Sequence, residues 1–180
     1  MDYNFQKERI LSSKPNDLTR IVDEFVSKNE AWTIELLIDL LESDRPEIRN
    51  AGAIGIYELR PQKALEPLLN AIFKQENHNY NGTLVWALGQ LDCKNRLIDI
   101  FRILFYESYE AKISAYEILD SQIFEFSKTD LKEIKSMWIN LQASPDRSPD
   151  FDKGDVRIMI SDAVEGFLSY LGNNKKAGNK

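Results

Sequence analysis

Apolar residues recur every three or four positions along most of the chain, which is the spacing of a helix that buries one face. Residues 48–59 carry them at Ile48, Ile56 and Leu59, with small residues such as Gly52 between them. Residues 34–41 are richer in leucine and isoleucine and keep the same spacing. The pattern predicts an all-α fold with two kinds of amphipathic helix, which we call A (leucine-rich) and B (rich in small residues).

Both kinds of segment are repeated along the chain. Offsets of 31 and 32 residues relate successive copies, and the fourth B copy follows a longer gap of 45. The A copies are 34–41, 65–72, 97–104 and 130–141, and the B copies are 48–59, 80–91 and the stretches that begin at Ala111 and Val156. A period of this length is typical of stacked repeats, in which each unit buries its apolar face against its neighbours. The predicted unit is one A helix followed by one B helix.

Polar and helix-breaking residues separate the predicted helices. Asp44 is placed to cap the first B helix, and Pro46 to occupy its first turn. Pro67 would fall in the second turn of an A helix and predicts a kink or a local shift there. We predict a single domain over 1–172, followed by a disordered tail at 173–180. The domain starts with an N-terminal cap over 1–29, which contains a helix at 17–28. Three regular helix pairs over 30–122 follow, and then a fourth pair over 129–172 with an inserted loop at 143–154.

Two stretches, LLESDRPEIR at 40–49 and WALGQL at 86–91, resemble the HEAT repeat family in its short, phycobilisome-lyase-like form. The resemblance covers about residues 31–122 and extends more loosely over 129–171. Lys112 replaces the family's arginine in the third unit, the second unit lacks both the acid–proline turn and the arginine, and Tyr57 stands where glycine is expected. The resemblance implies a right-handed α-solenoid of about four antiparallel helix pairs, with an N-terminal capping helix and with the B helices on the concave side. It implies no reaction, because most members bind macromolecules.

The charge balance bears on the choice of partner. The formal net charge is −6, and setting aside the positive charges of Lys175, Lys176 and Lys180 leaves −9 for residues 1–172 (−6 − 3). Such a body repels phosphate backbones, since sequence-independent binding to nucleic acid depends on Lys and Arg. The charge favours a basic protein partner or serves only solubility.

Helical geometry assigns an outward column to each B helix. If Ile48, Gly52, Ile56 and Leu59 face the core, positions 47, 50, 54, 57 and 58 lie on or near the opposite side, and the offsets carry these columns to the other copies. The columns contain eight acids, no Lys or Arg, and two large aromatic residues. The predicted partner-binding residues are Glu47, Tyr57, Glu58, Trp86, Glu110, Glu117, Asp120, Asp155, Asp162 and Glu165. They describe an acidic groove with aromatic anchors; the alternative is an ordinary solvated surface, because an acidic protein exposes acids on any helix.

Few residues offer catalytic or metal chemistry. One cysteine, Cys93, and one histidine, His78, exclude a disulfide framework and a structural zinc site. The aspartates at 146, 150, 152 and 155 lack the spacing of a calcium loop. We therefore expect no cofactor, no metal and no enzymatic activity.

Localisation follows from the ends and the apolar runs of the chain. The opening MDYNFQKERI lacks the basic start and apolar run of a signal peptide, and no stretch of 18 apolar residues occurs. We expect a cytoplasmic protein that does not bind membranes.

The leading hypothesis is a protein-binding module, monomeric or in a heterodimer with its basic partner, comparable in size and charge to bacterial immunity proteins that neutralise toxin domains. One alternative is a HEAT-like DNA glycosylase that would use Trp86 with Asp120 or Asp162. The absence of basic residues around them disfavours nucleic acid. A lyase-like or chaperone-like accessory protein is the other alternative.

Overall fold

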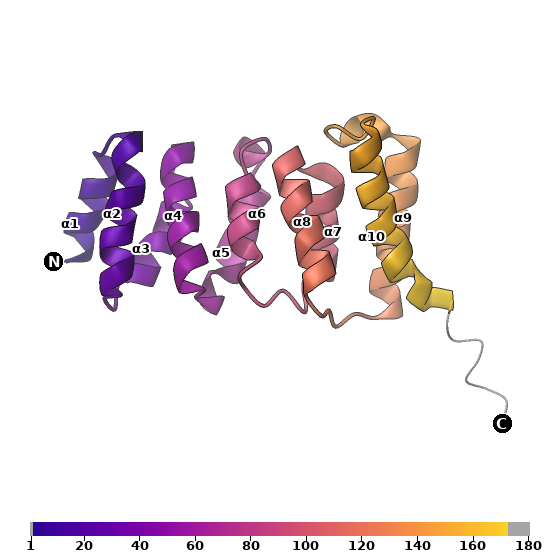
Figure 1. Ribbon diagram of the computed structural model, residues 1–180, viewed down its shortest axis with the longest axis horizontal. Helices are drawn as coiled ribbons and strands as arrows, with labels where there is room; N and C mark the ends of the chain where they lie inside the picture. The colour runs from indigo at the N-terminus through magenta and orange to yellow at the C-terminus, as the bar shows by residue number, and fades with distance from the viewer. Residues whose placement is uncertain (1, 173–180) are drawn as a thin grey trace, which may run out of the picture. The chain divides into compact units, whose positions relative to one another are not determined.

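The computed structural model describes residues 2–172, and every regular element in that range is a helix (Figure 1). The prediction of an all-α fold is confirmed. None of the helices between residues 2 and 172 is long and apolar enough to cross a membrane. The α-helices are α1 Tyr3–Leu11, α2 Pro15–Lys28, α3 Thr33–Leu40, α4 Pro46–Leu59, α5 Leu65–Ile72, α6 Gly82–Leu88, α7 Leu97–Tyr106, α8 Tyr109–Ser121, α9 Lys128–Ala143 and α10 Gly154–Gly172.

The helices form two compact units, which divide between Asp92 and Cys93. This boundary falls in the junction that the sequence places after the second helix pair. The prediction of one domain over 1–172 stays a prediction, and each unit is described by itself. The predicted tail at 173–180 lies outside the described residues.

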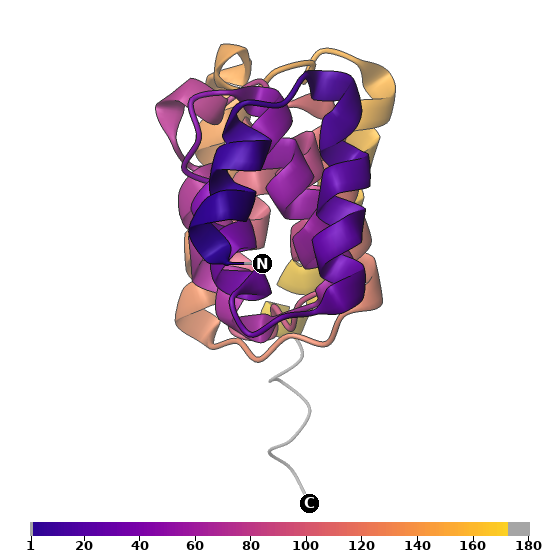
Figure 2. The same cartoon turned by 90° about the vertical axis from the view of Figure 1, so that its left-hand side faces the viewer.

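The first unit is built in two layers of helices. In one layer α4 packs against α2 on one side and α6 on the other, while α3 packs on α4 and α5 packs on α6 from the second layer. Figure 2 shows α1 and α2 at the N-terminal end, where Arg9 of α1 and Glu24 of α2 form an ion pair of 2.6 Å. Buried leucine, isoleucine and valine side chains fill the space between the layers.

Two glycines of α4 allow the layers to approach closely. A Cβ atom on Gly52 would lie 2.8 Å from the carbonyl oxygen of Leu37 and 2.9 Å from the Cβ of Leu40. A Cβ on Gly55 would lie 2.4 Å from the side chain of Leu37. Gly52, which the sequence pattern assigns to the core-facing side of its helix, therefore lies where an A helix and a B helix meet.

The second unit contains two helical hairpins. α7 packs on α8 and α9 packs on α10, while α7 contacts α9 and α8 contacts α10. The rings of Phe101 and Phe105 are fully buried, with centroids 5.6 Å apart. Ser127 and Asp130 form a capping box that fixes the start of α9, since each side chain accepts a hydrogen bond from the other's backbone N–H.

A buried polar donor recurs at the same aligned position of three B segments. Arg49 Nη1 donates to the Ser43 carbonyl at 2.7 Å, Asn81 Nδ2 to the Ile72 carbonyl at 3.3 Å, and Lys112 Nζ to the Glu107 carbonyl. All three side chains are buried. Each donor forms a hydrogen bond with a carbonyl near the end of the preceding helix. Burying that carbonyl without a hydrogen bond would destabilise the fold. Lys112 and Asn81 thus keep the backbone contact of the arginine they replace.

Two local predictions were wrong, and a third is met in one of its two forms. Asp44 does not cap α4; Arg45 is the N-cap and Pro46 takes the first position, as expected for proline. At Pro67 the structure shows the local shift: a 3₁₀ turn over Gln62–Ala64 precedes α5, which starts only at Leu65, so that the proline lies in the first turn, where no intrahelical N–H donor is needed. The second B helix is shorter than predicted and comprises only Gly82–Leu88.

Candidate functional site

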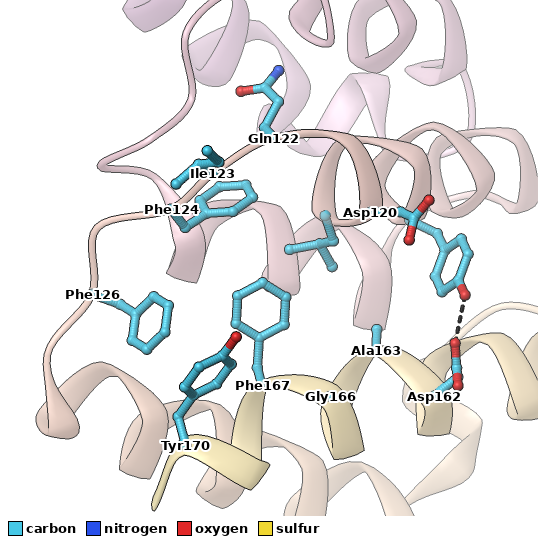
Figure 3. Close-up of a pocket in the computed structure, with 12 residues that line it drawn as sticks. Asp120, Gln122, Ile123, Phe124, Phe126, Asp162, Ala163, Gly166, Phe167 and Tyr170 are labelled. Carbon is cyan, nitrogen blue, oxygen red and sulfur yellow. Dashed lines mark hydrogen bonds between the residues drawn. The ribbon is translucent and has the colours of Figure 1, made fainter.

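The C-terminal unit contains a pocket of about 460 Å³ between α8, α10 and the segment that joins α8 to α9 (Figure 3). Its volume lies within the roughly 300–1,000 Å³ of small-ligand sites. Of the described residues that line it, none is Lys or Arg. The lining residues are Tyr116, Leu119, Asp120, Gln122, Ile123, Phe124, Phe126, Asp162, Ala163, Gly166, Phe167 and Tyr170.

The joining segment 122–126 is non-helical and is held in place by hydrogen bonds. The Gln122 side-chain oxygen accepts from the Cys93 backbone N–H at 3.0 Å, and the Glu125 N–H donates to the Lys94 carbonyl at 2.9 Å. The capping box at Ser127 then ends the segment. Fixed at both ends, the segment presents Phe124 and Phe126 to α10.

Four aromatic rings form one wall of the pocket. Phe167 of α10 is central, with its ring centroid 6.0 Å from that of Phe124 and 5.7 Å from that of Phe126, both in edge-to-face contact. The Tyr170 ring lies 5.5 Å from that of Phe126. Tyr170 is 58% exposed and Ile123 is 89% exposed, so this apolar wall opens to solvent.

Two carboxylates lie at the other end of the pocket. Asp120 is on α8 and Asp162 on α10, and both are exposed. The Tyr116 hydroxyl donates to Asp162 Oδ2 at 2.6 Å (Figure 3). This hydrogen bond to the carboxylate raises the pKa of Tyr116, with burial as the next cause. Tyr116 therefore stays a donor at neutral pH and holds Asp162 in place.

Gly166 keeps the floor of the pocket open. It lies in the middle of α10, between Asp162 and Tyr170, and a Cβ atom built on it would meet nothing within 4 Å. The space is therefore available to a ligand, and a side chain at this position would fill it.

The predicted acids of α8 and α10 all lie on the surface. Glu110, Glu117, Asp120, Asp155, Asp162 and Glu165 are exposed. Among residues 2–172, none of these six carboxylates has a Lys or Arg nitrogen within 4 Å, although Asp162 accepts from Tyr116 and Glu165 from the Ser161 hydroxyl. We call these six residues the α8–α10 acidic face. Within residues 2–172, no ion pair with Lys or Arg neutralises these six charges, although the pKa of Lys153 is raised first by the hydrogen bond and charge of Asp150 and then by the attraction of Asp155.

Acids of the first unit are placed differently. Glu35 pairs with Lys63, Asp39 with Lys7 at 2.9 Å, and Glu42 with Lys74. The hydrogen bond from Lys63 holds the pKa of Glu35 below its ordinary value. These acids connect neighbouring segments of the unit, whereas no residue between 2 and 172 forms such an ion pair with the α8–α10 acidic face.

The four predicted binding residues of the first unit divide into two groups. Tyr57 and Trp86 stack, with ring centroids 3.7 Å apart, and Trp86 is 41% exposed. Glu58 is exposed, but Glu47 is half-buried and pairs with Arg45 at 2.8 Å. Its pKa is lowered first by its own backbone N–H and then by Arg45. Among the predicted partner-binding acids, Glu47 is therefore the least available to a partner protein.

Sequence reasoning missed the aromatic wall. The segment 122–126 lies between the predicted helices, and its rings carry no helical period; Tyr116 and Phe167 read as packing residues. The available signal was the alternation of Phe124 and Phe126 with exposed Ile123 and Glu125, which is typical of an extended segment with one buried side.

Neither Cys93 nor His78 lines the pocket. No group of three or more His, Cys, Asp or Glu residues able to hold a metal ion occurs in the part of the chain that is described. Cys93 is buried, and His78 is half-buried at the end of a short 3₁₀ helix, Gln75–Asn77. The pocket is thus the best-formed candidate site.

No protein-family model matches the chain, and no curated protein matches it at a significant level. The resemblance to HEAT repeats therefore stays a prediction.

Proposed function

We propose that this protein is a non-enzymatic binding module that engages a basic protein through the α8–α10 acidic face. The observation that carries the proposal is the set of six exposed carboxylates, none of which has a Lys or Arg nitrogen within 4 Å among the described residues. Charges left uncompensated on one face raise the association rate and the specificity for a partner of opposite charge.

The same proposal includes the arrangement of the helices. Helix pairs related by the sequence repeat would continue as a right-handed HEAT-like solenoid of about four pairs, with the B helices along one face. In that arrangement the stacked Tyr57 and Trp86 would add an aromatic anchor of the kind that dominates many interfaces. The helix order and the packing of successive helices within each unit support this arrangement.

A small acidic binding module acting in the cytoplasm is suited to neutralising a basic enzyme domain, and we propose an immunity or inhibitor role of this kind. A role in nucleic-acid processing is less well supported, because the described residues that line the pocket include Asp120 and Asp162 and no Lys or Arg. Nothing in the pocket lining favours a lyase-like or chaperone-like role over simple binding.

The proposal is tested by capture from lysate of the source cells with immobilised protein at low and high salt. The matched baits are wild type, a Glu117→Gln/Asp162→Asn variant, and a Glu133→Gln/Asp146→Asn variant that removes two exposed charges outside α8 and α10. We expect a basic protein that is released by salt from the wild type and the second variant but is not retained by the first. Equal retention by all three, or recovery of nucleic acid, would contradict the proposal.

A further inference from the structure

The pocket combines a cation-attracting end with an aromatic wall. Asp120 and Asp162 supply two negative charges, and Tyr116 holds Asp162 in place. Phe126, Phe167 and Tyr170 supply ring surfaces, and the faces of aromatic rings attract cations. An anion would be repelled by the carboxylates, and a purely apolar ligand would remove part of their hydration without replacing it.

We propose that this pocket binds the side chain of an arginine presented by the basic partner. The inference rests on the proposed function and names the group that the α8–α10 acidic face recognises. A guanidinium is planar and forms forked hydrogen bonds with carboxylates, so it would lie at the end of the pocket that holds Asp120 and Asp162, with the methylene groups of the side chain along the aromatic wall. A lysine ammonium is a strongly hydrated point charge and cannot form the forked contact.

The shape of the pocket agrees with a long, partly apolar side chain. Ala163 and Gly166 are the small residues of α10 along its floor, and Gly166 leaves open space where any other residue would place a Cβ. The methylene groups of an arginine would cover the exposed apolar surface near Tyr170 and Ile123. The wall is also preformed, because Phe124 is buried and the segment 122–126 is tied to Cys93 and Lys94. Little conformational entropy would then be lost on binding.

The test is an NMR titration of the full chain with N-acetyl-arginine amide. The matched probes are N-acetyl-citrulline amide, which has nearly the same shape without the charge, and N-acetyl-lysine amide. We expect saturable shifts at Gly166, Tyr170 and Ile123, with binding of the arginine probe about tenfold tighter than that of citrulline, as one charge-assisted contact provides. Equal affinity for arginine and citrulline, or for arginine and lysine, would overturn the proposal.

Two pairs of variants locate the binding. Gly166→Leu fills the pocket and should abolish binding, whereas Gly166→Ala adds little volume and should retain most of it; circular dichroism checks that both remain folded. Asp120→Asn should weaken the arginine probe about tenfold. Glu133→Gln, which removes an exposed charge on α9 outside both the pocket and the α8–α10 acidic face, should leave it unchanged. Unaltered binding by Gly166→Leu would show that the arginine binds elsewhere.

The two proposals fail in different ways. If the arginine probe does not bind while the wild-type protein still captures a salt-released basic protein, the pocket inference is wrong and the acidic face remains an interface. If the probe binds in the pocket but no basic protein is captured, the pocket recognises a small guanidinium ligand and the proposed partner class is wrong.

Discussion

Tyr57 of α4 and Trp86 of α6 stack face to face, with ring planes inclined by only 8° and centroids 3.7 Å apart. The repeat alignment pairs Tyr57 with Gly89 and Trp86 with Ile54, so neither aromatic residue has an aromatic counterpart in the other copy. The two unusual residues therefore compensate for each other, since each covers the apolar surface that the other would expose.

Breaking this stack should cost stability without unfolding the first unit. Trp86→Leu and Tyr57→Leu should each lower the free energy of unfolding, and the double variant should show a coupling of about 0.5–1.5 kcal/mol between them. Urea denaturation followed by circular dichroism measures the cycle. If the two single changes in the free energy of unfolding add up to that of the double variant, each ring stabilises the unit only through its own burial and the stack adds nothing.

Two glycines should respond in opposite ways to the same substitution. Gly52→Ala should destabilise by about 1–3 kcal/mol, because the new Cβ would meet the Leu37 carbonyl oxygen at 2.8 Å, and Gly52→Leu should cost more. Gly166→Ala should stabilise by about 0.5–1 kcal/mol, since its Cβ would meet no neighbour within 4 Å and alanine favours the helix. Thermal melts of the two alanine variants provide the comparison; equal shifts would show that α4 can move away from α3.

Lys112 should make stability depend on pH on the alkaline side of neutrality. Burial lowers the pKa of this amine to about 8, against the opposing attraction of Glu107 and Asp150. Between about pH 8 and the unfolded value of 10.5, the unfolded chain binds more protons than the folded one, so this group makes stability rise with pH.

The control for that effect is Lys112→Met, which removes the titrating group and keeps an unbranched side chain. Relative to this variant, the wild type should gain stability from pH 8 to pH 10, by at most about 1.4 kcal/mol per pH unit. Urea midpoints at four pH values test it. Parallel profiles for the two proteins would show that Lys112 does not titrate in this range.

Charge reversal on the α8–α10 acidic face should act on binding kinetics. Glu117→Lys with Asp162→Lys should leave the helical circular dichroism signal intact and slow association with the captured basic protein about tenfold or more at low salt. Glu133→Lys with Asp146→Lys reverses the same number of charges outside α8 and α10 and should change the rate much less. Surface plasmon resonance over a range of salt gives both rates, and unchanged association by the first variant would remove its residues from the interface.

The helices could be predicted because their signal is local. The apolar spacing at Ile48, Gly52 and Ile56 follows from 3.6 residues per turn, whatever the helix packs against. The same geometry placed all six acids of α8 and α10 on exposed positions. Helix starts were less predictable, as Asp44 and Pro67 show, because a start depends on which residues compete to cap it.

The pocket and the aromatic stack required the tertiary structure. Phe126 and Phe167 belong to different elements, and the spacing within one element says nothing of where the ring of another will lie. The extended segment 122–126 has its place because the Gln122 side chain and the Glu125 backbone bond to residues about thirty positions earlier in the chain. The sequence thus determined which residues form helices and which side chains face outward, since helical periodicity decides both. Only the tertiary structure decided which outward residues meet, because contacts between elements depend on packing over long separations in sequence.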